Sequence, residues 1–219
     1  MTHNTLTALL TAAALMLSCT SCTTSAQGES DQDPSGETVI TLSDDGVQVD
    51  GADASTDPAS AVYVGGEIIY YRDGTDETYG EGSQEEQHSE QEAAAHTVVT
   101  ITQPGTYRVS GKLSQGQLFV DLGEGAEDDP EAVVTLILDG VDITCTVAPA
   151  VFFYRVYECA SQDLSDAGPT VDTSAAGANV ILAADSENLV SGSHVARIYE
   201  EGTTDKMHKY DGAFYSRMS

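Results

Sequence analysis

Short β-branched runs, separated by corners of Gly, Asp, Asn or Ser, constrain the fold of this chain more than any other feature. The segment HTVVTITQPGTYRVSGKLSQGQLFVDL, which begins at His96, holds three runs: Val98–Thr102, Tyr107–Leu113 and Gln117–Leu122. Five more follow between residues 132 and 199. No stretch shows a convincing amphipathic helical period, so the pattern predicts an all-β fold.

The runs also share an internal pattern. YRVSGKL, LILDGVDI and NLVSGSHV each carry an apolar pair, then a small or acidic residue, then Gly and a renewed strand, and VQVDGAD does the same near the start. Recurring short strands at Gly corners favour stacked coils, as in a parallel β-helix. A β-sandwich has a similar strand texture, so the pattern leaves both architectures open.

The charge of the chain excludes one class of partner. Eight Lys and Arg stand against 36 Asp and Glu among 219 residues, for a formal charge of −28. Such a surface repels phosphate backbones, so nucleic-acid binding is not expected. It repels acidic polymers too, unless divalent cations bridge the two.

The N-terminus predicts export and a lipid anchor. LTALLTAAALML is an apolar run of signal-peptide length, too short to span a membrane, and LSCTSC follows it. Cysteine after small residues suits lipoprotein processing, with Cys22 favoured over Cys19. The alternative is a plain secretory signal cut near Ala26. We therefore expect a signal peptide over 1–22 and an extracellular protein that is lipid-anchored to the cell membrane.

The rest of the chain divides by composition. A polar, acidic tether is predicted over residues 23–36, and a β segment with a hairpin at an Asp-Gly turn over 37–80. Residues 81–96 read as an acidic, low-complexity loop, with His88 and His96 as solvated histidines. The strand-rich domain then extends over 97–219.

Two cysteines lie in that domain. Outside the cytoplasm, an even pair suggests a disulfide, so a bridge between Cys145 and Cys159 is predicted. The alternative is two buried thiols that never meet.

Four segments, taken in order, are similar to a known family. VTITQPGTYRVSGKLSQGQLFVDL, VTLILDGVDITC, NVILAADSENLVSGS and YDGAFYSRMS resemble the opening coils of bacterial carbohydrate-binding domain-containing proteins, which are secreted or lipid-anchored and common in clostridia. The resemblance spans 37–219, apart from the acidic loop. It implies a right-handed parallel β-helix related to pectate lyases that binds polygalacturonate, with calcium in the structure. Because the family continues with further coils, it also implies that this chain is an N-terminal fragment.

Calcium needs six to eight oxygen ligands, and two segments offer carboxylates. LDGVDIT supplies Asp139 and Asp142, and DKMHKYD supplies Asp205 and Asp211. Asn188, in SENLVSG, is read instead as a structural amide that satisfies backbone groups at a coil corner.

Catalysis is the alternative to binding. A lyase needs a basic group beside the calcium site, and DKMHKYD is the one crowded segment of that kind. Ser193 and His194 do not form a catalytic pair, because adjacent strand residues face opposite ways. We therefore assign no catalytic residue.

Sugar contact usually needs an exposed aromatic ring, but the sequence does not identify the carbohydrate-binding residues. In VFFYRVYEC we expect Phe152 or Phe153 inside, with Tyr154 and Arg155 nearer the surface. Candidate platforms are Tyr70, Tyr71, Tyr154, Tyr157, Tyr199 and Tyr210. Three functions stay open: a non-catalytic carbohydrate-binding protein, which we favour, a polysaccharide lyase, and a structural adhesin without a sugar ligand.

Overall fold

The computed structural model describes residues 36–70, 87–159 and 174–193, together with the backbones of three short strands near the C-terminus. All of them belong to one unit, Asp31–Ser219. The predicted signal peptide and most of the tether lie outside the described residues.

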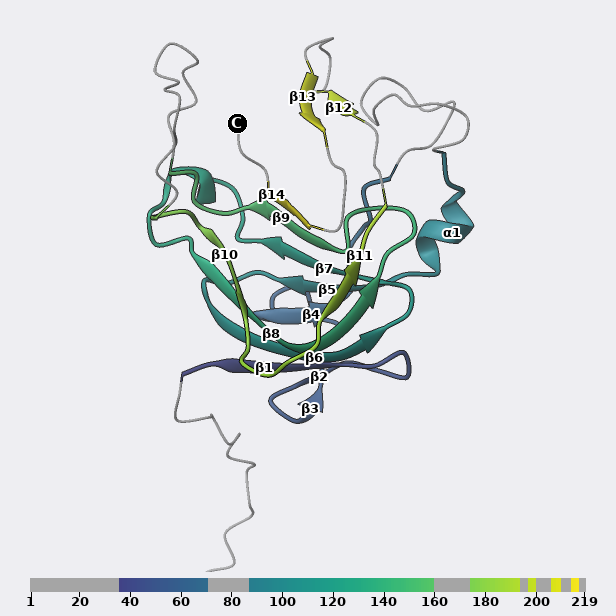
Figure 1. The fold of residues 1–219 in the computed structure, drawn as a ribbon. Coiled ribbons are helices and arrows are strands. Elements are labelled where there is room, and N and C mark those ends of the chain that lie inside the picture. Colours follow the sequence, from purple (N-terminus) through teal and green to yellow (C-terminus); the bar gives the residue numbers. More distant parts are fainter. Residues whose placement is uncertain are drawn as a thin grey trace, which may run out of the picture. The chain divides into compact units, whose positions relative to one another are not determined.

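Seven strands form the first sheet, called sheet A here (Figure 1). Across the sheet the order is β10–β8–β6–β1–β2–β3, and β11 also pairs with β8. β1, β6, β8, β10 and β11 pair in parallel, whereas β2 and β3 are antiparallel. The strands are β1 (Thr38–Leu42), β2 (Gln48–Val49), β3 (Ala52–Asp53), β6 (Gly105–Leu113), β8 (Val134–Thr144), β10 (Ala178–Leu182) and β11 (Leu189–Ser191).

Five strands form the second sheet, sheet B, in the order β14–β9–β7–β5–β4. β5, β7, β9 and β14 pair in parallel, and β4 is antiparallel to β5. The strands are β4 (Val62–Val64), β5 (Thr97–Ile101), β7 (Gly116–Asp121), β9 (Val151–Arg155) and β14 (Phe214–Ser216). The remaining elements are α1 (Glu90–Ala94), the 3-10 turn Ala126–Asp128, and an antiparallel pair of strands, β12 (Arg197–Tyr199) and β13 (Lys206–Lys209).

The fold is all-β, as the sequence predicted, and both sheets are mixed. The first three predicted runs correspond to β5, β6 and β7, and the predicted hairpin is the antiparallel pair β1–β2. From β5 onward the chain crosses between the sheets: β5, β7 and β9 lie in sheet B, and β6, β8 and β10 lie in sheet A (Figure 1). From β7 to β10, each strand pairs in parallel with the strand that precedes it in its own sheet.

The core lies between the sheets, because alternate residues of each strand point inward. Ile40, Val109 and Leu136 from sheet A share one hydrophobic cluster with Val99 and Leu118 from sheet B, and all five are fully buried. Their burial is the main stabilising contribution to such a fold, at roughly 25 cal/mol for each Å² of apolar surface removed from water.

Candidate functional site

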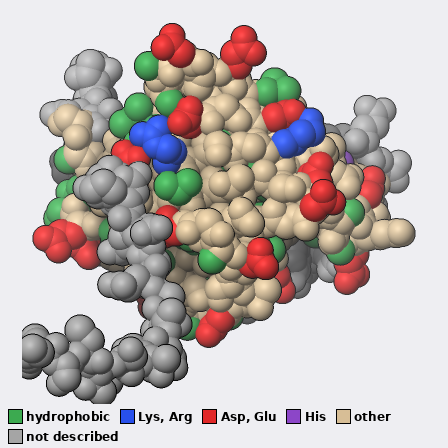
Figure 2. Space-filling view, turned by 90° about the horizontal axis from the view of Figure 1, so that it is seen from below, with side chains coloured by type: hydrophobic (Ala, Val, Ile, Leu, Met, Phe, Trp, Pro, Cys, Tyr) green, Lys and Arg blue, Asp and Glu red, His purple; other side chains and the backbone are tan. Residues whose placement is uncertain are grey.

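The outer face of sheet A carries charged side chains in ion pairs. Arg108 lies between two acids: its Nε is 2.9 Å from Glu37 Oε2, and its Nη1 is 3.1 Å from Asp139 Oδ2. Further along β6, Lys112 pairs with Asp142 of β8. Figure 2 shows Lys and Arg atoms in two separate places, each beside acidic side chains. The hydrogen bonds that Arg108 donates to Glu37 and Asp139 raise the pKa of its guanidinium, so this cation stays charged.

This arrangement bears on the predicted calcium ligands. Asp139 and Asp142 each bind a basic side chain, on opposite sides of the corner at Gly140. Asp205 and Asp211 lie outside the described residues. In the part of the chain that the structure describes, no three His, Cys, Asp or Glu side chains come together as a metal site would require. The calcium site stays a prediction.

Asn188 forms hydrogen bonds with the backbone of β8 at the corner around Gly140. Its Oδ1 accepts hydrogen bonds of 3.0 Å from the backbone N–H groups of both Gly140 and Val141, and its amide donates to Ser186 Oγ at 2.7 Å. The predicted structural role of Asn188 is confirmed. It holds the turn between β10 and β11 against the corner of the neighbouring strand.

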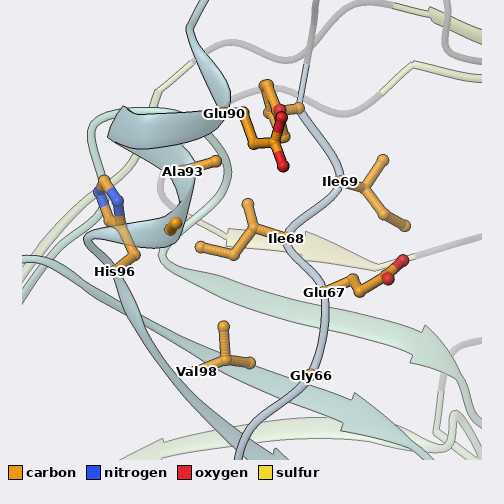
Figure 3. Close-up of a pocket in the computed structure, with 10 residues that line it drawn as sticks. Gly66, Glu67, Ile68, Ile69, Glu90, Ala93, His96 and Val98 are labelled. Atoms are coloured by element: carbon orange, nitrogen blue, oxygen red, sulfur yellow. The ribbon is translucent and has the colours of Figure 1, made fainter.

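A pocket of about 430 Å³ opens beside α1. In Figure 3, Ile68, Ala93 and Val98 point toward one another, whereas Glu67 and Ile69 lie on the other side of their segment. No Lys or Arg is among the described residues that line it. The lining residues are Gly66, Glu67, Ile68, Ile69, Tyr70, Glu90, Ala93, Ala94, His96 and Val98.

His96 is a structural residue of the pocket wall, and its predicted solvent exposure is wrong. The backbone N–H of Thr146 donates to His96 Nε2 at 3.1 Å, so the ring carries its proton on Nδ1, which donates to Glu92 O at 2.8 Å. The buried ring therefore ties the end of α1 to the loop after β8. Both ring nitrogens are engaged within the protein, which suits packing rather than proton transfer.

An aromatic cluster lies on the outer face of sheet B. Phe119 of β7 pairs in register with Phe152 of β9, and their rings meet edge to face with centroids 5.4 Å apart. Tyr154 lies near-parallel to Phe119, with centroids 5.6 Å apart and an angle of 26°. Phe152 and Phe153 are buried while Tyr154 and Arg155 are partly exposed, as the sequence predicted. Phe119 and Tyr154 are both partly buried and pack against the hydrophobic core.

A planar ion pair borders this cluster. Arg155 Nε and Nη2 donate to the two carboxylate oxygens of Asp121, at 2.5 and 2.6 Å. The guanidinium also lies over the ring of Tyr154, 5.4 Å from its centroid. Bidentate Arg–carboxylate pairs are among the stronger hydrogen-bonded contacts in proteins. They fix the position of both side chains, so this edge of the cluster has a defined geometry.

The two domain cysteines are thiols in the structure, with Cys145 buried and Cys159 partly exposed. Burial raises the pKa of the Cys145 thiol. The disulfide between them stays a prediction that thiol counting can test.

Other predicted features lie outside the described residues. These are the lipidation site Cys22 with its alternative Cys19, the acidic ends of DKMHKYD, His194, and the candidate tyrosines Tyr71 and Tyr210. Of the other candidate tyrosines, Tyr70 lines the pocket and Tyr154 belongs to the aromatic cluster. No helix in the described residues is long and apolar enough to cross a membrane.

Sequence reasoning missed two features of these sites. The first is α1, whose capping box joins Ser89 and Glu92; the pattern Ser-x-x-Glu was present in the predicted loop and signals a helix start. The second is the pairing of Asp121 with Arg155, residues 34 apart in sequence. Only the register of β7 against β9 brings them together, and no local pattern indicates it.

Comparison with known proteins gives one match. A family model described as "Carbohydrate-binding domain-containing protein" matches residues 95–162. The matched segment runs from just before β5 to just after β9 and includes the aromatic cluster and its ion pair. No curated protein and no solved structure matches the chain. The family match supports a carbohydrate-binding role for this protein.

Proposed function

We propose that this protein is a non-catalytic carbohydrate-binding protein whose ligand is an acidic plant polysaccharide such as polygalacturonate, bound with calcium. The family match over residues 95–162 is the observation that carries the carbohydrate-binding part. The finer part rests on the resemblance of the strand segments to pectin-binding proteins. The domain strands provide a rigid scaffold, and the described aromatic rings provide apolar contact surface for sugars.

The charge balance explains why calcium belongs in this proposal. The chain carries a formal charge of −28, and polygalacturonate is also an anion. The two anions repel each other at low ionic strength, and monovalent salt screens this repulsion without creating an attraction. A divalent cation that binds carboxylates of both partners at once would bridge them and hold them together. Binding is therefore expected to require calcium.

We further propose that the domain is a parallel β-helix. The supporting observation is the path of the chain from β5 to β10, which alternates between the two sheets. From β7 onward, each strand pairs in parallel with the strand two before it in the chain. In an ordinary β-sandwich most neighbouring strands are antiparallel. Stacked coils would place the same strand face of each coil in a row, which suits an extended polymer.

Anchoring at the cell surface completes the proposal. A diacylglyceryl group at Cys22 would hold the domain at the membrane, with the polar residues 23–36 as tether. The double variant Cys19→Ser, Cys22→Ser is expected to leave the membrane fraction, with wild type as control. Retention of the double variant in membranes would contradict lipid anchoring.

One incubation separates binding from catalysis. The chain is mixed with polygalacturonate in calcium or in chelator, and retention of the protein is measured together with the ultraviolet absorbance of unsaturated product. Calcium-dependent retention without product is expected. Product formation would identify a lyase instead, and neither retention nor product would favour a structural adhesin.

A further inference from the structure

We propose that β10 pairs, along the edge that faces away from β8, with the β10 strand of a second copy of this chain. β10 ends sheet A, and no strand of the described residues pairs with its other edge (Figure 1). The N–H of Ala183, just after β10, bonds to Leu138 O of β8. Because backbone groups alternate in direction along a strand, the N–H and C=O groups of Ala178, Val180 and Leu182 point away from β8.

The side chains of β10 extend the hydrophobic core beyond its last buried strand. Val180 is in register with Leu136 of β8. Leu182 is in register with Leu138, and both leucines of β8 are fully buried. Register partners share a face of the sheet, so Val180 and Leu182 lie on its core side. They are nevertheless 42% and 65% exposed, and Ile181 on the outer face is 51% exposed. A further strand at this edge would cover them.

β10 lacks the features that usually protect an edge strand. Natural edges avoid pairing by being very short or by carrying charged side chains, prolines or bulges. β10 has five residues, ANVIL, with no charge and no proline, and it pairs with β8 without a shift in register. β3, at the other end of sheet A, has two residues and ends in Asp53, and β4, at an edge of sheet B, has three. Of these edges, β10 is best suited to accept another strand.

A second copy supplies a strand that matches this edge. A twofold axis at Val180 sets two β10 strands antiparallel, with Ala178 of each copy opposite Leu182 of the other. The outward backbone groups then meet in three pairs of residues, which can exchange about six hydrogen bonds. Apolar side chains face one another on the core side of the joined sheet.

The charge of the chain also favours contact at this edge. The formal charge is −28, so two copies repel each other wherever their acidic side chains approach. β10 carries no charged residue, and the nearest described acids, Asp185 and Glu187, lie in the turn that follows it. Contact through β10 therefore brings together the two copies with little local repulsion.

The size of the apolar patch predicts a weak dimer. Four large side chains around the edge are 42 to 65% exposed: Val180, Ile181, Leu182 and, on β11, Leu189. Together they leave on the order of 400 Å² of apolar surface in water, a size that often marks an interaction site. A stable complex usually covers about 800 Å² on each partner, so we expect a dissociation constant that is roughly micromolar or weaker. Because salt screens the repulsion between the copies, association should strengthen as salt rises.

Sedimentation velocity of the full chain, over a wide range of concentrations at low and high salt, tests the proposal. Leu182→Lys places a charge at the edge, as natural edge strands do. Val180→Pro removes an N–H that points away from β8, so pairing with β8 is kept. The matched control, Thr41→Lys, adds the same charge at an exposed position of β1, which already has partners on both edges. All four proteins share the same N-terminus, so any association through it appears equally in each.

Wild type and Thr41→Lys should form a dimer whose fraction grows with concentration and with salt. Both β10 variants should weaken dimerisation about tenfold or more, the loss of at least one good contact. Circular dichroism checks that each variant is folded. Leu182 is 65% exposed, so its variant should fold even if Val180→Pro does not.

Two results would overturn the proposal. The first is a dimer that the folded β10 variants form as readily as wild type does, which would place the interface elsewhere. The second is a wild-type monomer at every concentration and salt. If hydrogen exchange then shows the amides of Val180 and Leu182 to be protected in that monomer, a segment of the same chain occupies the edge instead.

Discussion

Asn188 Oδ1 accepts a hydrogen bond from the backbone N–H of Gly140, a residue 48 positions earlier in the chain. The same oxygen accepts from Val141, whose side chain is buried. One side chain thus satisfies two backbone donors at the corner of β8. These two hydrogen bonds link the turn between β10 and β11 to the corner of β8 at Gly140.

Replacing Asn188 should therefore destabilise the domain. Asn188→Ala leaves the backbone donor of Val141 without its partner, at a cost of about 1 to 3 kcal/mol in the free energy of unfolding. Asn188→Asp keeps an acceptor oxygen and should cost clearly less. Urea unfolding of both variants measures the difference, and equal losses would contradict the assigned hydrogen bonds.

Two glycines at corresponding corners should respond differently to alanine. Gly111 in β6 has φ +93°, and an added Cβ would lie 2.2 Å from the carbonyl oxygen of Leu42. Gly140 in β8 has φ +80°, but nothing lies within 4 Å of its added Cβ. Gly140→Ala should lower the free energy of unfolding by about 1 kcal/mol, because alanine is strained in the left-handed conformation of that residue.

Gly111→Ala has the same strain and in addition a clash between its Cβ and the backbone of β1. We expect it to lower the free energy of unfolding by about 3 kcal/mol or more. Thermal melts of the two variants, compared with wild type, give the ranking. Equal melting temperatures would show that β1 can move away from β6, and would contradict the close approach of Gly111 to the backbone of Leu42.

Tyr107 makes stability depend on alkaline pH. The side chain is 3% exposed, its hydroxyl donates to Gln103 O at 2.8 Å, and burial raises its pKa to about 12. In the unfolded chain a tyrosine loses its proton near pH 10. Because the unfolded state then binds fewer protons than the folded state, stability must fall as pH rises from about 10 to about 12.

The variant Tyr107→Phe isolates that effect. Near neutral pH, wild type should be more stable by about 1 kcal/mol, the value of the hydrogen bond. Across the alkaline range this advantage should disappear and reverse, by up to about 3 kcal/mol for a shift of about two pKa units. Denaturant melts at several pH values measure it; a constant difference between the proteins would contradict the burial of the hydroxyl.

Counting free thiols tests whether the predicted disulfide between Cys145 and Cys159 forms. Protein produced in an oxidising compartment is unfolded without reductant and treated with a reagent that labels free thiols. If Cys145 and Cys159 are joined, neither takes label, and reduction should cost about 3 kcal/mol of stability for a closed loop of this size. If both take label, the bridge is absent, and the buried Cys145 should react only after unfolding.

Much of the fold follows from local sequence. Alternating apolar residues identify β5, β6 and β7, since one face of each strand must be buried. The helix α1 was missed because five residues are too few to set up a helical period, although its Ser89–Glu92 cap was legible. Local sequence does not predict which strands pair in parallel, because the pairing depends on contacts between residues far apart in the chain.

The candidate site was predictable only in part. The prediction that Tyr154 and Arg155 lie nearer the surface than Phe152 is confirmed by the burial pattern of β9. The partner of Arg155 depends on the bulge at Tyr154, and nothing in VFFYRVYEC marks that extra residue. The environment of Asp139 depends likewise on β6, which supplies Arg108 from 31 residues earlier.

Native affinity electrophoresis of the wild-type chain against a panel of soluble acidic and neutral polysaccharides tests the central claim most directly. Each gel is run in calcium and in chelator, beside a protein that binds no sugar. We predict that polygalacturonate retards the chain in calcium and that chelator abolishes the effect. A folded chain whose mobility no polysaccharide alters, in either condition, would contradict a carbohydrate-binding function.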